Sequence, residues 1–331
     1  MDEIIGIGNA LVDILAHIEG DSVLAGMNLP KGSMQLIDEK RFGDVSEKIS
    51  ALNPRRATGG SAANAILALA HLGRRPGFIG KVGNDELGKF YSDTMAQAGV
   101  GVCFAHAPQP TGVASTFISP DGQRTFATYL GAAVTLSPDD ISEEKMKGYK
   151  YLHLEGYLVQ NHALIDRAVD VARKLGIKIC LDMASYNVVE SDRDYFTRLV
   201  TESVDIVFAN EEESMAFTGL EPEKSLESIA ALCDTAVVKL GARGCIARSR
   251  SAAGGYASCP AGEVERVVDT TAAGDFFTAG FMYAFTAGCG LDVCLQAGTL
   301  LSAAVIQVTG TALAETTWAE LRSQLKTLCN A

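Results

Sequence analysis

Short aliphatic runs alternate with helix-like stretches along most of this chain, and this alternation restricts the possible folds more than any other feature. The aliphatic runs end in Gly, Asn, Asp or Glu, which is typical of buried strands. They are residues 3–15, 75–83, 149–158, 176–184, 204–213 and 235–245. Apolar residues recur at spacings of three and four, as in helices, in residues 61–73, 85–99, 161–176 and 225–233. Strands that alternate with helices predict an α/β fold with a mostly parallel sheet covered on both faces.

Two regions interrupt this alternation. Residues of about 13–45 and 101–130 carry patterns of β type with turn residues between them, and we find no helical period there. We therefore expect one domain over residues 1–331, with a small sheet inserted into the α/β body. In a parallel sheet, ligands bind at the carboxyl ends of the strands, where polar residues gather in this sequence.

Composition excludes several classes of partner. The 331 residues include 28 Lys and Arg against 40 Asp and Glu, and the difference of 28 − 40 gives a net charge of −12. This charge offers no attraction to nucleic acid or to an anionic membrane, so we expect small soluble partners. The N-terminus lacks the basic region of a signal peptide, which predicts a cytoplasmic protein. Eight cysteines occur without a C-x-x-C pair and are interpreted as reduced, buried thiols.

The segment 269–278 reads DTTAAGDFFT, in which two aspartates enclose small residues just before an apolar run. Where a helix begins with residues as small as Ala272, Ala273 and Gly274, backbone N–H groups can converge on an anion at the positive end of the helix dipole. Asp275 would lie in that first turn. It is either a helix cap or a functional carboxylate.

Two other motifs precede or begin helices. Gly59 and Gly60 stand before a predicted helix that carries Asn64, so a ligand could approach the backbone there; the alternative is a turn with a Ser cap. Asn210 ends a predicted strand three residues before Glu213, and an amide with a carboxylate can hold the water shell of Mg²⁺. Acidic residues are also favoured at helix N-termini for electrostatic reasons, which is the alternative for Glu213.

A third motif follows the last predicted strand, where Lys239, Gly241 and Gly244 lie in a turn. Lys239 either meets a phosphate or faces solvent, and the turn is not a P-loop because GxxxxGK[ST] is absent from the sequence. A carboxylate beside an anion cradle, an Asn/Glu pair and a Gly-Gly turn occur together here. This combination is what phosphoryl transfer requires.

The motifs GGSAAN, NEEE, LGARG and DTTAAGDFFTAGF, in this order and over nearly the whole chain, resemble those of the ribokinase-like (PfkB) family of sugar and nucleoside kinases. The resemblance implies a three-layer α/β/α fold with a mostly parallel central sheet and a small β-sheet lid. It also implies transfer of the γ-phosphoryl group of ATP to a hydroxymethyl oxygen, with Mg²⁺ and a monovalent cation such as K⁺ as cofactors.

The resemblance also assigns roles to individual residues. Asp275 matches the catalytic base, and the backbone of Ala272, Ala273 and Gly274 matches the anion hole, although many relatives have Gly in place of Ala272. An aspartate with an ordinary pKa near 3.9 is ionised at pH 7 and can accept the proton of an alcohol. Asn210 and Glu213 match the magnesium and phosphate motif, with Glu213 acting through water. The nucleotide loop is matched by Lys239, Gly241 and Gly244.

Further matches concern the acceptor and the ions. Positions that hold substrate hydroxyls in the family are matched by Asp13, Gly59, Gly60 and Asn64. Asp269 and Thr271 match the start of the monovalent-cation loop. Asn9, Asp13 and Gln35 look most like the adenosine-kinase branch, and Arg124 stands where relatives have a lid arginine that can approach the transferred phosphate. Arg124 could instead be an exposed arginine after a turn.

Three functions remain open from the sequence. The first is an ATP-dependent adenosine kinase, the second is a kinase of ribose, fructose or a similar sugar, and the third is an inactive regulator that binds a sugar or nucleoside. Either a monomer or a homodimer that pairs through the inserted sheet is compatible with the sequence.

Overall fold

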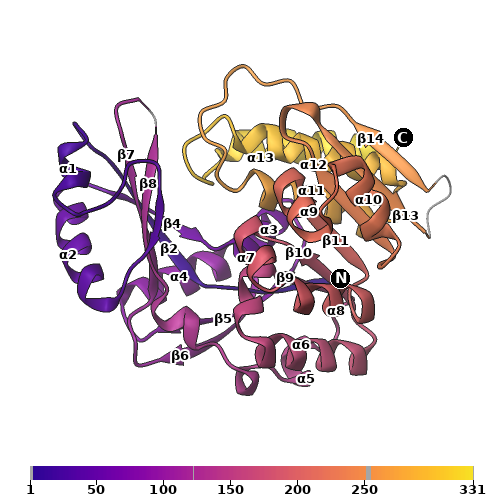
Figure 1. Cartoon of the computed structure of the whole chain (residues 1–331), viewed down its shortest axis with the longest axis horizontal. Coiled ribbons are helices and arrows are strands. Elements are labelled where there is room, and N and C mark those ends of the chain that lie inside the picture. The colour runs from indigo at the N-terminus through magenta and orange to yellow at the C-terminus, as the bar shows by residue number, and fades with distance from the viewer. Residues whose placement is uncertain (1–2, 122, 251–254, 331) are drawn as a thin grey trace.

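The computed structural model describes residues 3–121, 123–250 and 255–330, and within them the strands form a sheet of nine and a sheet of five. Figure 1 shows the nine-stranded sheet in the body and the five-stranded sheet at one side. The strands of the large sheet, in spatial order, are β14 (Tyr256–Cys259), β13 (Cys245–Ser249), β12 (Thr235–Lys239), β11 (Ile206–Asn210), β10 (Lys178–Asp182), β9 (Tyr151–Glu155), β1 (Ile4–Ile7), β5 (Gly77–Gly83) and β6 (Gly101–Ala107). From β12 to β6 the neighbouring strands are parallel, and β13 and β14 add antiparallel pairs. The expected α/β fold with a mostly parallel sheet is confirmed.

Helices cover both faces of the large sheet. One face carries α5 (Glu143–Met146), α6 (His162–Leu175), α7 (Tyr186–Ser191), α8 (Arg193–Glu202), α9 (Glu211–Thr218) and α10 (Pro222–Ala230). The other face carries α3 (Ser61–His71), α11 (Ala273–Thr286), α12 (Leu291–Val305) and α13 (Glu315–Asn330). Two separate apolar cores result, because successive side chains of a strand point to opposite faces. Helix α4 (Glu86–Gln97) packs against β5 and β6 and contributes Tyr91 and Met95 to the core on the side of α3 and α11.

The small sheet has the spatial order β3 (Met34–Leu36), β8 (Arg124–Tyr129), β7 (Gly112–Ile118), β2 (Leu11–His17) and β4 (Arg55–Gly59). Helices α1 (Ser22–Ala25) and α2 (Glu39–Ser50) cover its outer face (Figure 1), where the ring of Phe42 stacks on that of Tyr129. The opposite face of the sheet therefore lies toward the body.

The small sheet differs from the sequence-based expectation in its composition. The segment 13–45 contains α1 and the start of α2, so the prediction that it has no helical period is wrong. In the segment 101–130, β6 joins the edge of the large sheet instead of the small one, and β4 enters the small sheet from outside both segments. The run 3–15 forms two strands, one in each sheet, because the chain leaves the large sheet at residues 8–10. Hydrophobic patterning could not separate these cases, since a strand buried in either sheet has the same pattern.

From the sequence, the cysteines are expected to be reduced and buried. All eight are free, but only Cys180, Cys233, Cys245 and Cys294 are buried, so the expectation of burial is wrong for the half-buried Cys103, Cys259, Cys289 and Cys329. Within the described ranges 3–121, 123–250 and 255–330, no helix has the length and apolar character needed to cross a lipid bilayer.

Candidate active site

The site lies where four neighbouring parallel strands end. Strands β9, β10, β11 and β12 end in Glu155, Asp182, Asn210 and Lys239. Each of these residues is two positions after a residue that belongs to the face covered by α3 and α11, such as Cys180 in β10 or Val237 in β12. Because side chains alternate along a strand, the ends of these strands can present polar side chains to that face. The N-terminus of α3 meets Glu155 there, since Ala62 N donates to Glu155 Oε2, and the N-terminus of α11 lies against Lys239. The side chain of Asn210 instead bonds to Glu213 at the start of α9.

Asp275 lies in the first turn of α11 and accepts two hydrogen bonds from α3. Ser61 Oγ donates to Asp275 Oδ1 over 2.7 Å, and Asn64 Nδ2 donates to Asp275 Oδ2 over 2.9 Å. The structure thus brings together the two motifs GGSAAN and DTTAAGD, which are more than two hundred residues apart in the sequence. These two bonds fix the orientation of the carboxylate and leave lone pairs on both oxygens free to accept a proton.

The pKa of Asp275 is raised from its ordinary 3.8 to about 6. Burial is the main cause, the hydrogen bonds from Asn64 and Ser61 oppose it, and the charge of Asp182 adds to it. The side chain is only partly buried. Since about 6 is still below 7, Asp275 remains mainly ionised at neutral pH, and its raised pKa makes it a stronger base than an ordinary aspartate.

The loop before α11 is built to keep the start of the helix open. Ala272 is the N-cap residue, has a φ of +60° and gives no side-chain cap. A left-handed conformation costs a residue with a Cβ atom roughly 1 kcal/mol, which explains why glycine suits this position. The first N–H groups of a helix have no partner within the helix. Ala273 N donates to Thr270 O over 3.2 Å, so the N–H groups of Ala272 and Gly274 form the surface of backbone donors that fits an anion.

Arg124 connects the small sheet to this loop. Its Nη2 lies 2.5 Å from Asp269 Oδ2, and its Nη1 donates to Thr271 Oγ1 over 2.9 Å. Asp269 also accepts bonds from the N–H groups of Thr271 and Gly310. The side-chain oxygens that the sequence suggested for a monovalent cation are thus bonded to a guanidinium group, and in this arrangement they do not fit such a cation.

Asn210 and Glu213 form a capping box at the start of α9. Asn210 Oδ1 accepts from Glu213 N over 2.8 Å, while Glu213 Oε2 accepts from Asn210 N over 2.7 Å and Oε1 accepts from Asn210 Nδ2 over 2.8 Å. The alternative interpretation, an acidic residue at a helix N-terminus, is therefore confirmed, and the magnesium interpretation stays a prediction.

The carboxylate of Glu213 is 3% exposed, and burial raises its pKa to about 7, against the attraction of Lys239. Within the described parts of the chain, no cluster of three His, Cys, Asp or Glu side chains is arranged to hold a metal. Mg²⁺ is usually held by one or two carboxylates together with substrate phosphates and water. Glu213 supplies a hard oxygen donor of this kind, so it fits Mg²⁺ that is shared with a nucleotide.

On the opposite side of Asp275 lies Asp13, in strand β2 of the small sheet. Burial and the charge of Asp275 raise the pKa of Asp13 to about 7. A Cβ atom on Gly59 would collide with the Asp13 carboxylate, and one on Gly60, whose φ is +99°, would collide with the carbonyl oxygen of Asn9. Gly59 therefore leaves room for the Asp13 carboxylate, and Gly60 lets the start of α3 approach the backbone at Asn9.

Glu155 organises this side of the site and was not identified from the sequence. Its Oε1 accepts from Asn9 N over 2.9 Å and from Asn9 Nδ2 over 2.5 Å, and its Oε2 accepts from Ala62 N over 3.0 Å. Burial raises its pKa to about 7. Asn9 is thereby held at the start of the crossing into the small sheet. The available signal was the position of Glu155 at the end of a predicted strand, which it shares with Asp182.

Other predicted residues lie elsewhere. Gln35 pairs with Ala127, a buried residue on the helix-covered face of the small sheet, and Gln35 Nε2 donates to Ser33 Oγ over 3.3 Å. The structure therefore does not bring Gln35 together with Asp13. Gly241 and Gly244 flank the turn between β12 and β13, where both have positive φ.

The face of the small sheet that looks toward the body has a regular composition. Strand pairing places Asp13 in one row with Ala57, Ala114, Thr128 and Leu36. The next row contains Arg55, Leu15, Thr116, Phe126 and Met34. Met34 and Leu36 are 56% and 57% exposed. Apart from the exposed Arg55, the groups that share these two rows with the Asp13 carboxylate are small or apolar.

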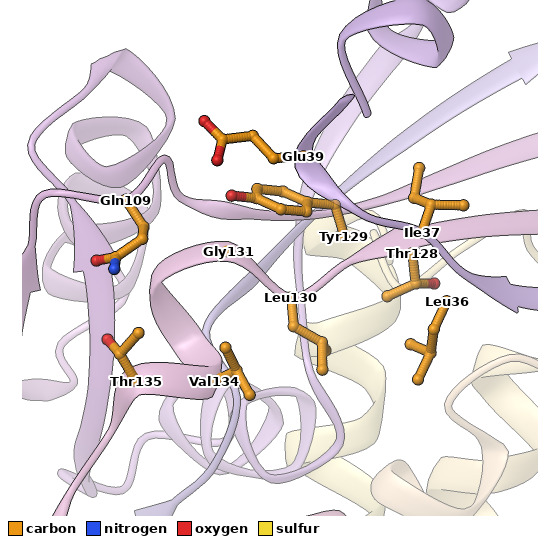
Figure 2. A pocket seen from close by; sticks show the side chains of 10 residues that line it. All are labelled: Leu36, Ile37, Glu39, Gln109, Thr128, Tyr129, Leu130, Gly131, Val134 and Thr135. Carbon is orange, nitrogen blue, oxygen red and sulfur yellow. The ribbon is translucent and has the colours of Figure 1, made fainter. Parts of the chain in front are cut away.

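Figure 2 shows a pocket of about 300 Å³ at the end of this surface, where β3 and β8 meet the 3₁₀ helix η1 (Gly131–Thr135). Its lining residues are Leu36, Ile37, Glu39, Gln109, Thr128, Tyr129, Leu130, Gly131, Val134 and Thr135. Asp13 and Asp275 do not line it. The pocket thus continues the surface around Leu36 in the direction away from Asp13 and Asp275.

A mostly parallel sheet between helices, a smaller sheet over its carboxyl edge, and a carboxylate at an open helix N-terminus define the ribokinase-like class of proteins. The chain matches the model of the pfkB family carbohydrate kinases over residues 34–318, and it belongs to this family. Kinases of this family are phosphotransferases with an alcohol acceptor; they use ATP and generally Mg²⁺. The resemblance seen in the motifs is confirmed.

Individual relatives differ in their acceptor. The chain is similar to adenosine kinase from Sinorhizobium meliloti, with 32% identity and a TM-score of 0.86 over 98% of this chain and 99% of that one. It is also similar to a probable sugar kinase from Rhizobium etli CFN 42, with 30% identity, a TM-score of 0.86 and the same coverage. Ribokinase from Haemophilus influenzae is 26% identical over 277 residues, which are 81% of this chain and 86% of that protein.

Proposed function

We propose that this protein transfers the γ-phosphoryl group of ATP to the hydroxymethyl oxygen of a nucleoside, with adenosine as the acceptor. The observation that carries the choice of a nucleoside is the composition of the small-sheet face. Asp13 is its carboxylate, which can accept hydrogen bonds from ribose hydroxyls. Beyond it, an apolar surface is formed by Leu36, Phe126 and Met34. This surface suits the flat face of a base, and a sugar without a base has no apolar group that would contact it.

The proposed chemistry assigns each group a role. Asp275, oriented by Ser61 and Asn64, accepts the proton of the acceptor hydroxyl as its oxygen attacks the γ-phosphorus. The bond from phosphorus to the bridging oxygen of ADP breaks, and ADP leaves. Backbone N–H groups at the start of α11 stabilise the charge on the transferred oxygens. Glu213 would hold Mg²⁺ through water, and Mg²⁺ supplies charge neutralisation for the nucleotide phosphates.

Arg124 is proposed to close the small sheet over the acceptor. In the structure it bridges the small sheet and the loop before α11 through Asp269 and Thr271. Such a contact excludes water from the space between the two sheets, as lids of phosphoryl-transfer enzymes must do to favour transfer over hydrolysis.

The test is a panel of nucleosides and sugars with ATP and Mg²⁺, read out as ADP formation. We expect kcat/KM to be highest for adenosine. A higher kcat/KM for ribose or fructose would refute the nucleoside and support the second candidate, a sugar kinase, which the similarity to ribokinase favours. Absence of turnover with tight binding of a nucleoside would support the third, an inactive binding protein.

A variant separates the apolar surface from the catalytic groups. Leu36→Asn should raise KM for the nucleoside about tenfold, because burial of one apolar side chain under a base contributes on the order of 1–2 kcal/mol to binding. KM for a sugar acceptor should change little, because a sugar has no base to bury Leu36. The control is Arg56→Gln in the same sheet, an exposed residue that pairs with Ile14 on the other face. An equal rise in KM for both acceptors would contradict contact between Leu36 and a base.

A further inference from the structure

A buried ion pair spans the end of β11. Lys239 Nζ lies 3.0 Å from Asp182 Oδ2, although these residues end β12 and β10, and β11 lies between those strands. The two side chains are 15% and 7% exposed. Removing both charges from water is costly, so such a pair adds little net stability compared with apolar residues of the same size. Its stabilising effect therefore does not account for its presence at the centre of the site.

The carboxylate of the pair is fixed by its own turn. Asp182 Oδ1 accepts from Ala184 N over 2.9 Å, and Ala184 has a φ of +66°, which is unfavourable for alanine. One oxygen of Asp182 is thus held by the backbone while the other holds the ammonium group. Lys239, a flexible side chain by nature, has a defined position as a result.

This position is against the start of α11. A Cβ atom on Gly274 would lie 3.0 Å from Lys239 Nζ, closer than ordinary van der Waals contact. The absence of a side chain at Gly274 therefore lets the ammonium group approach the same helix end that presents the backbone donors. The two positive potentials, that of the helix N-terminus and that of the lysine, converge on one small volume.

The ammonium group also lies between the two functional ends of the site. Against the effect of burial, the negative charges of Asp182, Glu213 and Asp275 attract this ammonium group and raise the pKa of Lys239, which favours the charged form of the lysine. In the proposed function, the acceptor hydroxyl lies next to Asp275, and Mg²⁺ with the nucleotide phosphates lies next to Glu213. A phosphoryl group that travels from the nucleotide to the hydroxyl must pass within reach of Lys239.

We propose that Lys239 is a catalytic residue that contacts the γ-phosphoryl group during transfer, and that Asp182 is the positioning residue that holds its ammonium group in place. This inference rests on the proposed kinase function. The acceptor oxygen bonds to the γ-phosphorus, the bond to the bridging oxygen breaks, the hydroxyl proton passes to Asp275 and ADP leaves. Lys239 keeps its protons throughout and neutralises charge on the transferred oxygens.

The test is a double-mutant cycle on turnover. Lys239→Met should lower kcat about a hundredfold, as loss of a preorganised donor to a transition state does, and should change KM for the acceptor less than about threefold. Asp182→Asn should lower kcat about tenfold. The double variant Asp182→Asn/Lys239→Met should be no slower than Lys239→Met alone, because Asp182 acts only through Lys239. The double variant also avoids an unpaired buried carboxylate, so it folds even if Lys239→Met does not.

A matched control is the ion pair of Lys178 and Asp205, at the opposite end of β10. Lys178 Nζ lies 2.5 Å from Asp205 Oδ1, but the lysine side chain is 55% exposed. Lys178→Met should leave kcat unchanged. A kcat within about threefold of wild type in folded Lys239→Met would overturn the role of Lys239, and multiplicative losses in the double variant would overturn the role of Asp182.

A binding measurement separates this inference from the choice of acceptor. Calorimetry with Mg²⁺ compares ADP with the β,γ-imido analogue of ATP, and it needs no acceptor. Wild type should bind the analogue more tightly than ADP, and Lys239→Met should lose at least about tenfold of that preference. An unchanged preference overturns the contact with the γ-phosphoryl group. If no acceptor in the panel supports turnover by the wild-type protein, the proposed function is refuted. The preference for the analogue over ADP then still tests the contact between Lys239 and the γ-phosphoryl group.

Discussion

Replacing Asp275 by asparagine should abolish most activity and at the same time stabilise the fold. The variant keeps the size of the side chain, and an amide can still bond to Ser61 and, if the Asn64 amide turns over, to Asn64. It cannot accept the hydroxyl proton. Loss of a general base lowers turnover by at least about a hundredfold. Nucleotide binding should be retained, because the backbone donors at the start of α11 are unchanged.

The gain in stability follows from the pKa of Asp275. This pKa rises from 3.8 in the unfolded chain to about 6 in the fold, so folding disfavours the ionised form. The difference, at 1.36 kcal/mol per pKa step, sets an upper limit of about 3 kcal/mol at pH 7. Because the side chain is partly open to water, we expect about 1–2 kcal/mol. Burial costs of this kind are the usual reason why active sites reduce stability.

The sign of the pH dependence distinguishes this cause from others. The folded state binds the proton more tightly than the unfolded state, so the destabilisation is small below pH about 4, grows between pH about 4 and 6, and is complete above. Urea unfolding of wild type and Asp275→Asn at pH 7 and pH 4 measures it. The advantage of the variant should shrink at pH 4. An advantage that is equal at both pH values, or a variant that is less stable at pH 7, would refute the reasoning.

Two further predictions concern catalysis and the small sheet. In a pH profile of wild-type kcat/KM, activity should rise between pH about 6 and pH about 7 and then level off, because Asp275 and Glu213 must both be ionised; a midpoint below about 4.5 would contradict the raised pKa values. Arg124→Gln should lower the free energy of unfolding by about 3 kcal/mol, since Asp269, whose side chain is 2% exposed, loses the guanidinium beside it. Urea unfolding measures this change against the exposed control Arg56→Gln, and a loss below about 1 kcal/mol would show that the bridge is not a structural contact.

The sequence alone determined the elements of the body. Aliphatic runs and helices with apolar spacing are local features, so the strands around residues 178–182, 206–210 and 235–239 and the helix at 162–175 were predicted correctly. The four motifs together also sufficed for the family, because features such as small residues at a helix start followed by a carboxylate are a local requirement of the chemistry.

What only the tertiary structure decided is which distant groups meet. Asp275 accepts hydrogen bonds from Ser61 and Asn64. Lys239 forms an ion pair with Asp182, and Arg124 of the small sheet forms one with Asp269 in the loop before α11. These contacts depend on strand order and on which face each side chain takes, and local propensity encodes neither. For the same reason the sequence could not divide the run 3–15 between two sheets. Local sequence motifs thus determined the family and its candidate residues. Which charged groups lie close enough to pair depends on the strand order, which places four strand ends side by side.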